Sequence, residues 1–283
     1  MNGILVVNKE KGYTSRDVVN VVCSSFNTKK VGHTGTLDPL AEGVLVLCLG
    51  KALKLTELLV SNDKEYLAKV RLGICTDTLD ITGSIIKEDQ KLSLTNSDID
   101  KVLNKFQGKI LQEVPLYSAV HVKGKRLYEY ARNKIEVELP KREVEIFEIE
   151  RLTDIKDNEF SIRCVVSKGT YIRSLIRDIG LALGTYATMV ELKRTRQGLF
   201  QINDSFTLEE IKNNNYTLLQ PTDVLNIPKI KVSEEMAFRI KNGQVLKKFF
   251  APDMAMILDN NDNLLAIYKT FKDDYVKPYK MFI

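Results

Sequence analysis

The sequence predicts an α+β fold around a mixed or mostly antiparallel central sheet, followed by a small β-rich domain. Segments with the two-residue alternation of strands and segments with the 3.6-residue spacing of helices both occur, but without the regular order of repeated βαβ units. After Pro228 the pattern changes to short apolar strands. A chain of 283 residues fits about two domains, and we expect them at residues 1–228 and 229–283.

Local patterns predict the elements of the first domain. Ile4 to Asn8 is a short strand. Thr14 to Asp17 is a helix start, because a hydroxyl can cap the helix and the acid favours its positive end. Val44 to Leu49 is an apolar strand followed by a helix at 51–59, and alternation predicts a strand from Tyr66 to Leu72. Further strands are predicted at 84–86, 117–122, 135–139, 144–150 and 160–166, and further helices at 97–106 (starting at Ser97), 172–183 and 207–212.

The segment 229–283 is predicted from short strand patterns. These are KIKVS, AMILD and LLAIYK, with an Asn-Gly turn at 242–243. Lysines are frequent among them. A small β domain of this kind can contact the phosphates of a nucleic acid.

The charge distribution permits a nucleic-acid partner. The net charge of +5 is too mild to require one. Three stretches, at 121–134, 167–177 and 191–198, concentrate lysine and arginine. Such stretches, with tyrosines close by, are typical of a groove for a phosphate backbone, although solvated basic faces would show the same charge.

Several protein classes are not supported by the sequence. No run approaches the roughly 18 apolar residues of a membrane span, and the first twelve residues show no basic leader, so we expect a cytoplasmic protein without a membrane partner. The four cysteines lie in apolar or strand-like segments without CxxC spacing, which is typical of small buried residues in a reducing compartment. His33 and His121 have no cysteine at ligand spacing, so no zinc site is predicted.

An acid in a glycine-punctuated loop is the first catalytic candidate. The loop GHTGTLDPLAEG, 32–43, brings Asp38 just ahead of an apolar strand, and Pro39 biases Asp38 away from helical backbone. A carboxylate held there can act as a nucleophile or a general base, or it can simply bond its own turn. The chain lacks a GK[ST] phosphate loop, a strand–GxGxxG–helix unit and a GxSxG elbow, so no cofactor is predicted.

Other candidate side chains are spread along the chain. Tyr66 either faces a pocket or is an ordinary core tyrosine. Asp77 and Asp80 lie in a turn, where they could bind an ion or, more simply, cap a helix. Arg173 follows Tyr171 at a helix start and could meet a carboxylate bidentately.

Four blocks of the sequence resemble, in order and spacing, the bacterial tRNA pseudouridine-55 synthases of the TruB type. The first, GHTGTLDPLAEGVLVLCLGKALKL, is similar to the family's GHTGxLDPxAxGxL signature. The others are DKEYLAKVRLGICTDTLDITG, VPLYSAVHVKGKRLYEYAR and CVVSKGTYIRSLIRDIGLALG. The resemblance covers most of residues 1–200, and the tail is similar to the small PUA-like RNA-binding domain that ends these enzymes. It implies a pseudouridine synthase-like catalytic domain that isomerises uridine in the T-arm of tRNA.

The resemblance also implies roles for individual residues. Asp38 would be the catalytic aspartate, with Arg173 paired to it. The uridine pocket would be lined by His33, Tyr66, Tyr171 and Leu192. Asp80 matches an acidic position of the second block, with no role assigned. His121, where the family commonly has lysine, and residues 114–116, near its Pro-Pro pair, are departures that leave local RNA contacts open.

The implied reaction needs no group donor. Making pseudouridine breaks the N1–C1′ bond, turns the uracil and joins C5 to C1′ without a redox change, so we expect a cofactor-free monomer that flips its target base. One carboxylate can attack either C6 or C1′, and the sequence leaves both open. Two rival classes also stay open: a non-catalytic RNA-binding protein, and a metal-dependent phosphoryl-transfer enzyme using Asp38, Asp77 and Asp80.

Overall fold

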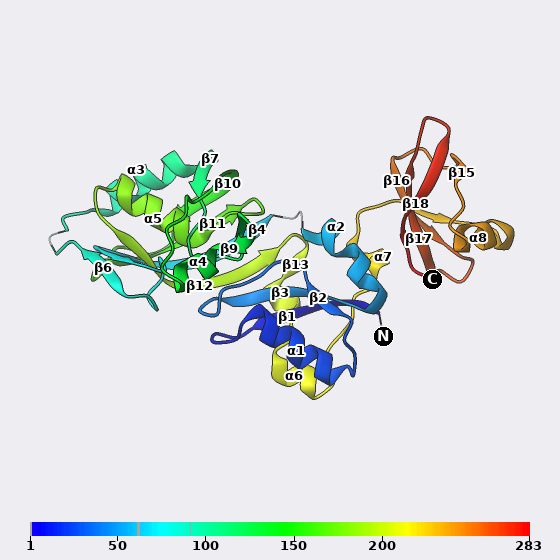
Figure 1. Cartoon of the computed structure of the whole chain (residues 1–283), viewed down its shortest axis with the longest axis horizontal. Coiled ribbons are helices and arrows are strands. Elements are labelled where there is room, and N and C mark those ends of the chain that lie inside the picture. The colour runs from blue at the N-terminus through cyan, green and yellow to red at the C-terminus, as the bar shows by residue number, and fades with distance from the viewer. Residues whose placement is uncertain (1, 61–62, 91) are drawn as a thin grey trace.

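The computed structural model describes residues 2–60, 63–90 and 92–283 and has the predicted α+β architecture. These residues form a nine-stranded mixed sheet in the order β1-β3-β12-β4-β11-β10-β7, with β2 paired to β3 and β13 to β12 (Figure 1). Within it, β12 and β3 are parallel and the other neighbours are antiparallel. The strands are β1 (Gly3–Lys9), β2 (Val31–His33), β3 (Glu42–Leu49), β4 (Lys64–Leu72), β7 (Gly108–Glu113), β10 (Lys141–Arg151), β11 (Glu159–Val166), β12 (Ala187–Gln197) and β13 (Phe200–Gln201).

Helices cover the sheet in two places, because each helix has an apolar stripe that needs a partner. α3 and α5 pack on the middle of the sheet around Ile176, and α1 and α6 cover one face of β1 and β3 around Leu47. α1 starts at the predicted capping box, in which Thr14 and Asp17 satisfy each other's backbone amides. The helices of this part are α1 (Ser15–Ser25), the 3-10 helix η1 (Gly50–Leu55), α2 (Thr56–Val60), α3 (Asn96–Phe106), α5 (Ile172–Ala182), the 3-10 helix η2 (Ile202–Asp204), α6 (Leu208–Lys212) and α7 (Pro221–Val224).

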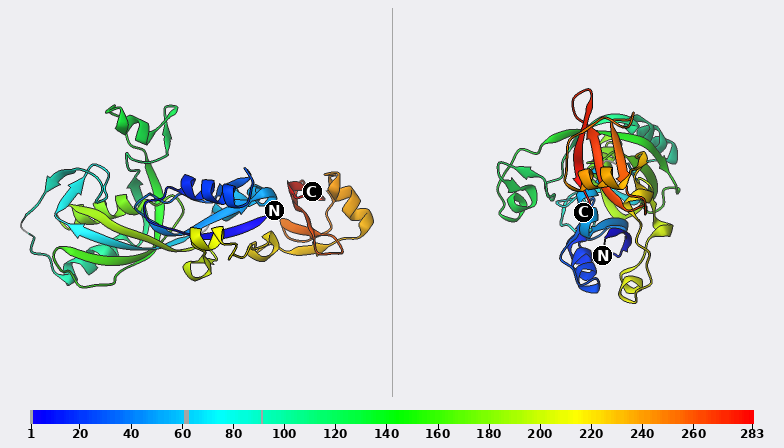
Figure 2. Two further views of the ribbon diagram at one scale, coloured as in Figure 1. Left: turned by 90° about the horizontal axis from the view of Figure 1, so that it is seen from below. Right: turned by 90° about the vertical axis from the view of Figure 1, so that its right-hand side faces the viewer.

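An arm, residues 114–140, leaves the body between β7 and β10. It carries the short strands β8 (His121–Val122) and β9 (Lys125–Arg126) and the helix α4 (Leu127–Arg132), and it projects from the body as the green segment of Figure 2. The arm has a small core of its own, formed by Val114, Leu127 and Tyr130, against which Tyr171 packs. The base of the arm therefore reaches the segment where α5 begins.

A second, five-stranded sheet lies at one end of the molecule (Figure 1), and we call residues 229–283 the tail. Its apolar residues Met256, Ile267 and Phe282 share a cluster with the outer face of β1 and β3. Lys280 Nζ also lies 2.5 Å from Glu57 Oε1 of α2, so the tail is packed against the body. In sheet order its strands are β14 (Lys229–Lys231), β16 (Met254–Leu258), β17 (Leu264–Thr270), β18 (Tyr275–Met281) and β15 (Leu246–Lys247), accompanied by α8 (Glu234–Lys241).

The structure differs from the sequence predictions at several elements. Residues 135–139 form no strand; their alternation instead places Val137 and Leu139 in the arm's core. The strand predicted at 117–122 is reduced to β8, and the one predicted at 84–86 is β6 (Ile85–Glu88), which pairs with β5 (Ile74–Thr76). α3 begins one residue early because Thr95 and Asp98, not Ser97, form its capping box.

Other elements escaped prediction. β12 is a central strand, but its sequence ATMVELKRTRQ was interpreted only as a basic stretch. β7, β15, β18 and α8 were also missed. The Asn-Gly pair at 242–243 ends α8 and does not join two strands.

Candidate active site

A pocket of about 200 Å³ lies where the loop before β3 meets β4, β12 and the start of α5. It holds Asp38, Tyr66, Tyr171, Arg173 and Leu192, five of the six site residues expected from the sequence. The remaining lining comes from Thr34, Gly35, Thr36, Leu37, Val60, Lys64, Lys168, Gly169, Thr170, Ile172 and Arg194. Residues as far apart in sequence as Thr34 and Arg194 thus converge on one space, which only the fold can arrange.

The backbone around Asp38 is held on both sides by α1 and by the end of β1. The buried Ser15 hydroxyl accepts from the Leu37 amide at 2.8 Å. The Pro39 carbonyl accepts from the Gly12 amide at 2.8 Å, and the buried Lys9 ammonium lies 3.5 Å from the same carbonyl. The loop therefore presents Asp38 from a fixed backbone.

The Asp38 carboxylate pairs with Arg173 side-on. Arg173 Nη2 donates to Asp38 Oδ1 at 3.2 Å, and Nε lies 2.8 Å from Oδ2. The second contact is an ion pair without an aligned hydrogen bond, since Nε has no partner by hydrogen-bond geometry. The Asp38 side chain is 37% exposed and that of Arg173 only 5%, so the acid faces the pocket while the base is buried behind it.

Three further groups fix the Arg173 guanidinium. Its Nη1 donates to the Thr78 carbonyl at 2.9 Å, and its Nη2 donates to the Tyr117 carbonyl at the base of the arm at 3.0 Å. Its Nη1 also lies 4.0 Å from Asp80 Oδ2. A buried guanidinium is costly unless charge and hydrogen bonds satisfy it, and here both do.

Asp77 and Asp80 both accept hydrogen bonds from residues of the turn in which they lie. Asp80 Oδ1 accepts from the Thr82 amide and from the hydroxyls of Thr78 and Thr82, and Asp77 Oδ1 accepts from the Ser84 amide. Neither caps a helix, which corrects that expectation. Asp80 instead fixes a turn whose Thr78 carbonyl holds Arg173.

Adjacent strands supply the opposite wall. In the β4–β12 ladder, Tyr66 faces Arg194 and Ala68 faces Leu192. Tyr66 and Leu192 are each 6% exposed, so they offer an aromatic and an aliphatic surface to a bound ring.

Arg194 is a site residue that the sequence did not single out. Its side chain is buried and binds the carbonyls of Val44, Thr36 and Gly35 at 2.7, 3.4 and 3.3 Å. No carboxylate of the described residues pairs with it. The period-two placement of Leu192 and Arg194 was the missed signal, since it puts both side chains on one face of a strand.

The close parallel pairing of β3 and β12 beside the pocket requires glycine. Gly43 has φ +105°, and a Cβ there would lie 2.2 Å from the Arg194 carbonyl oxygen. No other residue fits this approach without moving one of the strands.

His33 lies at the end of β2, outside the set of described residues that line the pocket. Its Nδ1 is buried without a hydrogen-bond partner, and burial lowers the pKa of its imidazole below the ordinary value. The ring is therefore neutral at pH 7. Tyr171 does line the pocket, and burial raises the pKa of its phenol, which stays protonated.

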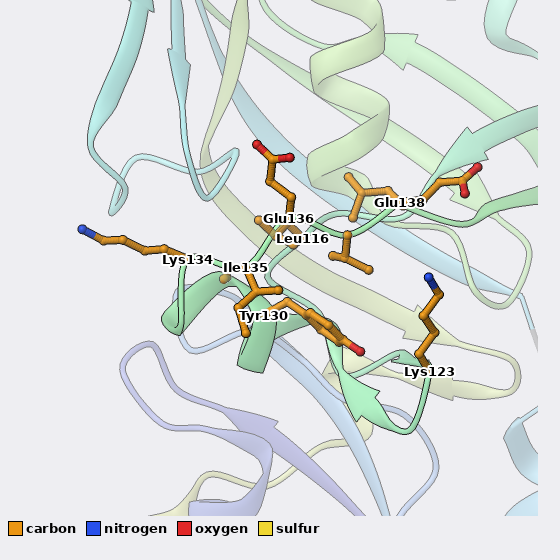
Figure 3. A pocket seen from close by; sticks show the side chains of 10 residues that line it. Leu116, Lys123, Tyr130, Lys134, Ile135, Glu136 and Glu138 are labelled. Atoms are coloured by element: carbon orange, nitrogen blue, oxygen red, sulfur yellow. The ribbon is translucent and has the colours of Figure 1, made fainter.

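A larger groove of about 710 Å³ lies on the arm (Figure 3). Tyr130, Lys123 and Lys134 border it, together with Glu136 and Glu138 (Figure 3). None of the expected site residues lies there. The smaller pocket, which holds five of the six expected site residues, is therefore the candidate active site.

The described residues include neither a metal-binding cluster nor a helix that could span a membrane. Residues 2–60, 63–90 and 92–283 contain no group of three or more His, Cys, Asp or Glu that could hold a metal ion. In the same ranges, no helix is long and apolar enough to cross a membrane. Cys48 and Cys164 are buried as expected, whereas Cys23 and Cys75 are only half-buried. Burial raises the pKa of the Cys48 and Cys164 thiols to about 11 and about 12.

The sequence is similar to known protein families and relatives over its full length. A family model described as TruB family pseudouridylate synthase (N terminal domain) matches residues 24–172, and one described as tRNA pseudouridylate synthase B C-terminal domain matches 173–225. A tRNA pseudouridine synthase B of Oceanobacillus iheyensis is 43% identical, covering 100% of this chain and 98% of the relative. The enzyme of the same name from Staphylococcus saprophyticus is 42% identical, covering 99% of both chains.

Solved structures show the same fold. The chain superposes on a chain of a Cbf5-Nop10-Gar1 complex with a TM-score of 0.73 and 28% identity, covering 99% of this chain and 85% of that one. A chain of an H/ACA RNP bound to a substrate RNA containing 2′-deoxyuridine gives a TM-score of 0.70 and 27% identity, again covering 99% and 85%.

Proposed function

The chain belongs to the TruB family and is an RNA pseudouridine synthase that acts on tRNA, and we propose that it isomerises uridine 55 in the T-arm with Asp38 as the nucleophile. The observation that carries this proposal is the Asp38–Arg173 pair in a pocket walled by Tyr66 and Leu192. The position of the target rests on the four sequence blocks shared with the tRNA pseudouridine-55 synthases.

Asp38 is suited to nucleophilic attack because it is accessible and held in place. The side-on pair with Arg173 orients the carboxylate, and its 37% exposure keeps it open to the pocket. Attack at C1′ of the sugar would displace N1 directly, whereas attack at C6 of the base would add Asp38 to the ring and allow the N1–C1′ bond to break. The uracil then turns within the pocket, C5 joins C1′, the bond to Asp38 breaks, and the C5 proton leaves while N1 gains one. The carboxylate is regenerated, so no group donor or redox partner is needed.

The pocket walls would hold a base taken out of the RNA stack. Extracting a stacked base costs a few kcal/mol. The Tyr66 ring and the Leu192 side chain can recover part of this cost by stacking and apolar contact with the uracil. We assign Tyr171 to the same wall and His33, as a neutral ring beside the loop, to the nucleotides flanking the pocket.

The basic surfaces would grip the rest of the tRNA. Within the arm, Arg126 and Arg132 lie over the ring of Tyr128 at 5.9 and 5.3 Å, a combination that suits phosphate and base contacts. We propose that residues 1–228 form the catalytic domain and that residues 229–283 are a PUA-like RNA-binding domain. We further propose a monomer that meets its tRNA in the cytoplasm.

The test uses an unmodified tRNA transcript and maps pseudouridine by carbodiimide labelling followed by primer extension. We expect one stop, at position 55, and no stop in a transcript carrying cytidine there. A matched assay with Asp38→Asn should give no product. Product at another uridine would refute the assigned position, and product from Asp38→Asn would refute the assigned nucleophile.

A further inference from the structure

We infer that Gln112, outside the pocket, is the positioning residue that sets the place of Tyr171 and Arg173. Gln112 lies on β7, the edge strand of the main sheet, 59 residues before Tyr171. Its side chain is 1% exposed. The inference rests on the proposed function only for the roles of Tyr171 and Arg173.

The Gln112 amide binds both polar groups of the Tyr171 backbone. Its Oε1 accepts from the Tyr171 amide at 2.8 Å, and its Nε2 donates to the Tyr171 carbonyl at 3.1 Å. Two opposed hydrogen bonds between one side chain and one residue fix the position and the orientation of that residue. The side-chain amide is suited to this task because it has a donor and an acceptor side by side.

Tyr171 is the residue at which α5 begins. It is the N-cap residue of α5, and its own side chain makes no capping hydrogen bond. Its carbonyl also accepts from the Leu175 amide at 3.0 Å, the first hydrogen bond of the helix. Gln112 therefore anchors the first residue of the helix from another strand, and its bond to the N-cap amide is the one that an N3 side chain makes in a capping box.

The position of this helix start decides the geometry of the pocket. Tyr171 lines it, and Arg173, two residues later, holds the Asp38 carboxylate. A shift of about 1 Å at a residue away from the chemistry can cost about 100-fold in rate. Both hydrogen bonds that the Gln112 side chain makes with the described residues go to Tyr171, and Gln112 is not among the described residues that line the pocket, so we assign its effect to the helix start.

Gln112 also links the active site to the arm. Glu113 ends β7 and the arm starts at Val114, whose side chain lies in the arm core that Tyr171 contacts. The Tyr117 carbonyl in the same stretch accepts from Arg173. A displacement of the arm base would therefore be transmitted to Tyr171 and Arg173 through contacts that include the Gln112 amide.

The test compares Gln112→Met with Gln107→Met in the full-length enzyme. Methionine keeps the length and apolar stem of glutamine but loses both hydrogen bonds. Gln107 is the control, because its Nε2 donates to the Phe147 carbonyl at 3.1 Å on the surface and Gln107 is not among the described residues that line the pocket. The readout is total pseudouridine formed in tRNA, in single-turnover and steady-state assays, which does not depend on which uridine is modified.

We expect Gln112→Met to lower kcat by about 10- to 100-fold with KM and tRNA affinity changed less than about threefold, since phosphate contacts dominate binding. Gln107→Met should stay within about twofold of wild type in both constants. Equal kcat values for the two variants, or a loss carried only by KM, would overturn the inference. The proposed target position is tested separately, by mapping pseudouridine in the tRNA product of the wild-type enzyme.

A double-mutant cycle separates positioning from a general loss of stability. In an Arg173→Met background, Gln112→Met should cost less than about threefold in the single-turnover rate, because residues that act as a unit are not additive. A full additional loss there would overturn the inference. If Gln112→Met fails to fold by circular dichroism, Gln112→Glu is used, which keeps the acceptor for the Tyr171 amide but loses the donor to its carbonyl. A wild-type kcat in a folded Gln112→Glu would count against the role.

Discussion

The pocket and the tail both carry many charged side chains, but they hold them in opposite ways. In the pocket, Arg173 and Arg194 are buried, and each is fixed by groups from two or more distant segments. In the tail, lysines such as Lys241, Lys247 and Lys272 are exposed on short elements. A buried charged group acts through the specific contacts that it makes. Exposed charges contribute to phosphate binding mainly through how many of them there are. Single substitutions should therefore damage the chemistry in the pocket, while only combined ones should weaken binding in the tail.

Asp38→Asn should have the largest effect. The change is isosteric and removes the nucleophile, so we expect turnover to be abolished while tRNA affinity and folding stay nearly unchanged. Affinity is measured by filter binding and product by single-turnover labelling. Measurable pseudouridine from the purified variant would mean that the pocket does not act through this carboxylate.

Arg173→Met should lower kcat by about 100-fold or more, since it removes the group that orients Asp38. Arg177→Met is the control, because Arg177 lies one turn further along α5 and pairs with Glu113 and Asp178 instead. It should lose less than about threefold in kcat, although some stability is lost with its two ion pairs. If both variants lose activity to a similar extent, the charges of α5 act collectively, as we expect of the lysines in the tail.

Tyr66→Phe should have an intermediate effect. The ring still stacks, but the hydroxyl, 3.5 Å from Arg194 Nη1, is lost. We expect KM to change little and kcat to fall by about 10- to 100-fold if the hydroxyl takes part in proton transfer. A rate close to that of wild type would confine Tyr66 to stacking.

Substituting tail lysines should affect affinity alone. We expect the combined change Lys241→Gln, Lys247→Gln and Lys272→Gln to raise KM for tRNA several-fold and to flatten the salt dependence of binding by up to about 0.9 per lost phosphate contact, with kcat unchanged. Lys231→Gln is the control, since Asp262 already compensates that lysine at 2.8 Å. Full-length variants are preferable to truncation because removing the tail would expose the apolar cluster shared with β1 and β3. An unchanged KM with a lowered kcat would mean that the tail helps to build the active site.

The last prediction concerns stability and pH, not activity. Burial lowers the pKa of Lys9, beneath the Asp38 loop, from 10.5 to about 8. Between these values the unfolded chain binds more protons than the folded one, so the contribution of Lys9 to stability rises with pH across that window, by up to about 1.4 kcal/mol per unit. Urea unfolding at pH 8 to 10 should show a steeper rise for wild type than for Lys9→Met. Parallel curves would mean that this lysine is not desolvated in solution.

Local sequence patterns were sufficient where neighbouring residues make the decisive contacts. The Thr14–Asp17 capping box, the apolar strand β3 and the alternating strand β4 follow from short-range hydrogen bonding and periodic burial, and all three were predicted. The expectation that Arg173 meets Asp38 came from resemblance, not from spacing, and the contact is present. β12 was missed because its charged side chains find partners in the folded sheet that the sequence does not display.

By itself, then, the sequence determined the fold class, most elements and the identity of the candidate acid, because these depend on local propensity and on one rigid loop. The tertiary structure alone decided that Arg194 is buried against the Asp38 loop, that His33 lies outside the pocket lining, and that Gln112 holds Tyr171 from an edge strand. The first of these outcomes depends on a contact between residues 159 apart, and the third on contacts between residues 59 apart. Such contacts form only when the sheet brings the strands together. The period-two pattern of β12 could place Leu192 and Arg194 on one face, but it could not show what that face packs against.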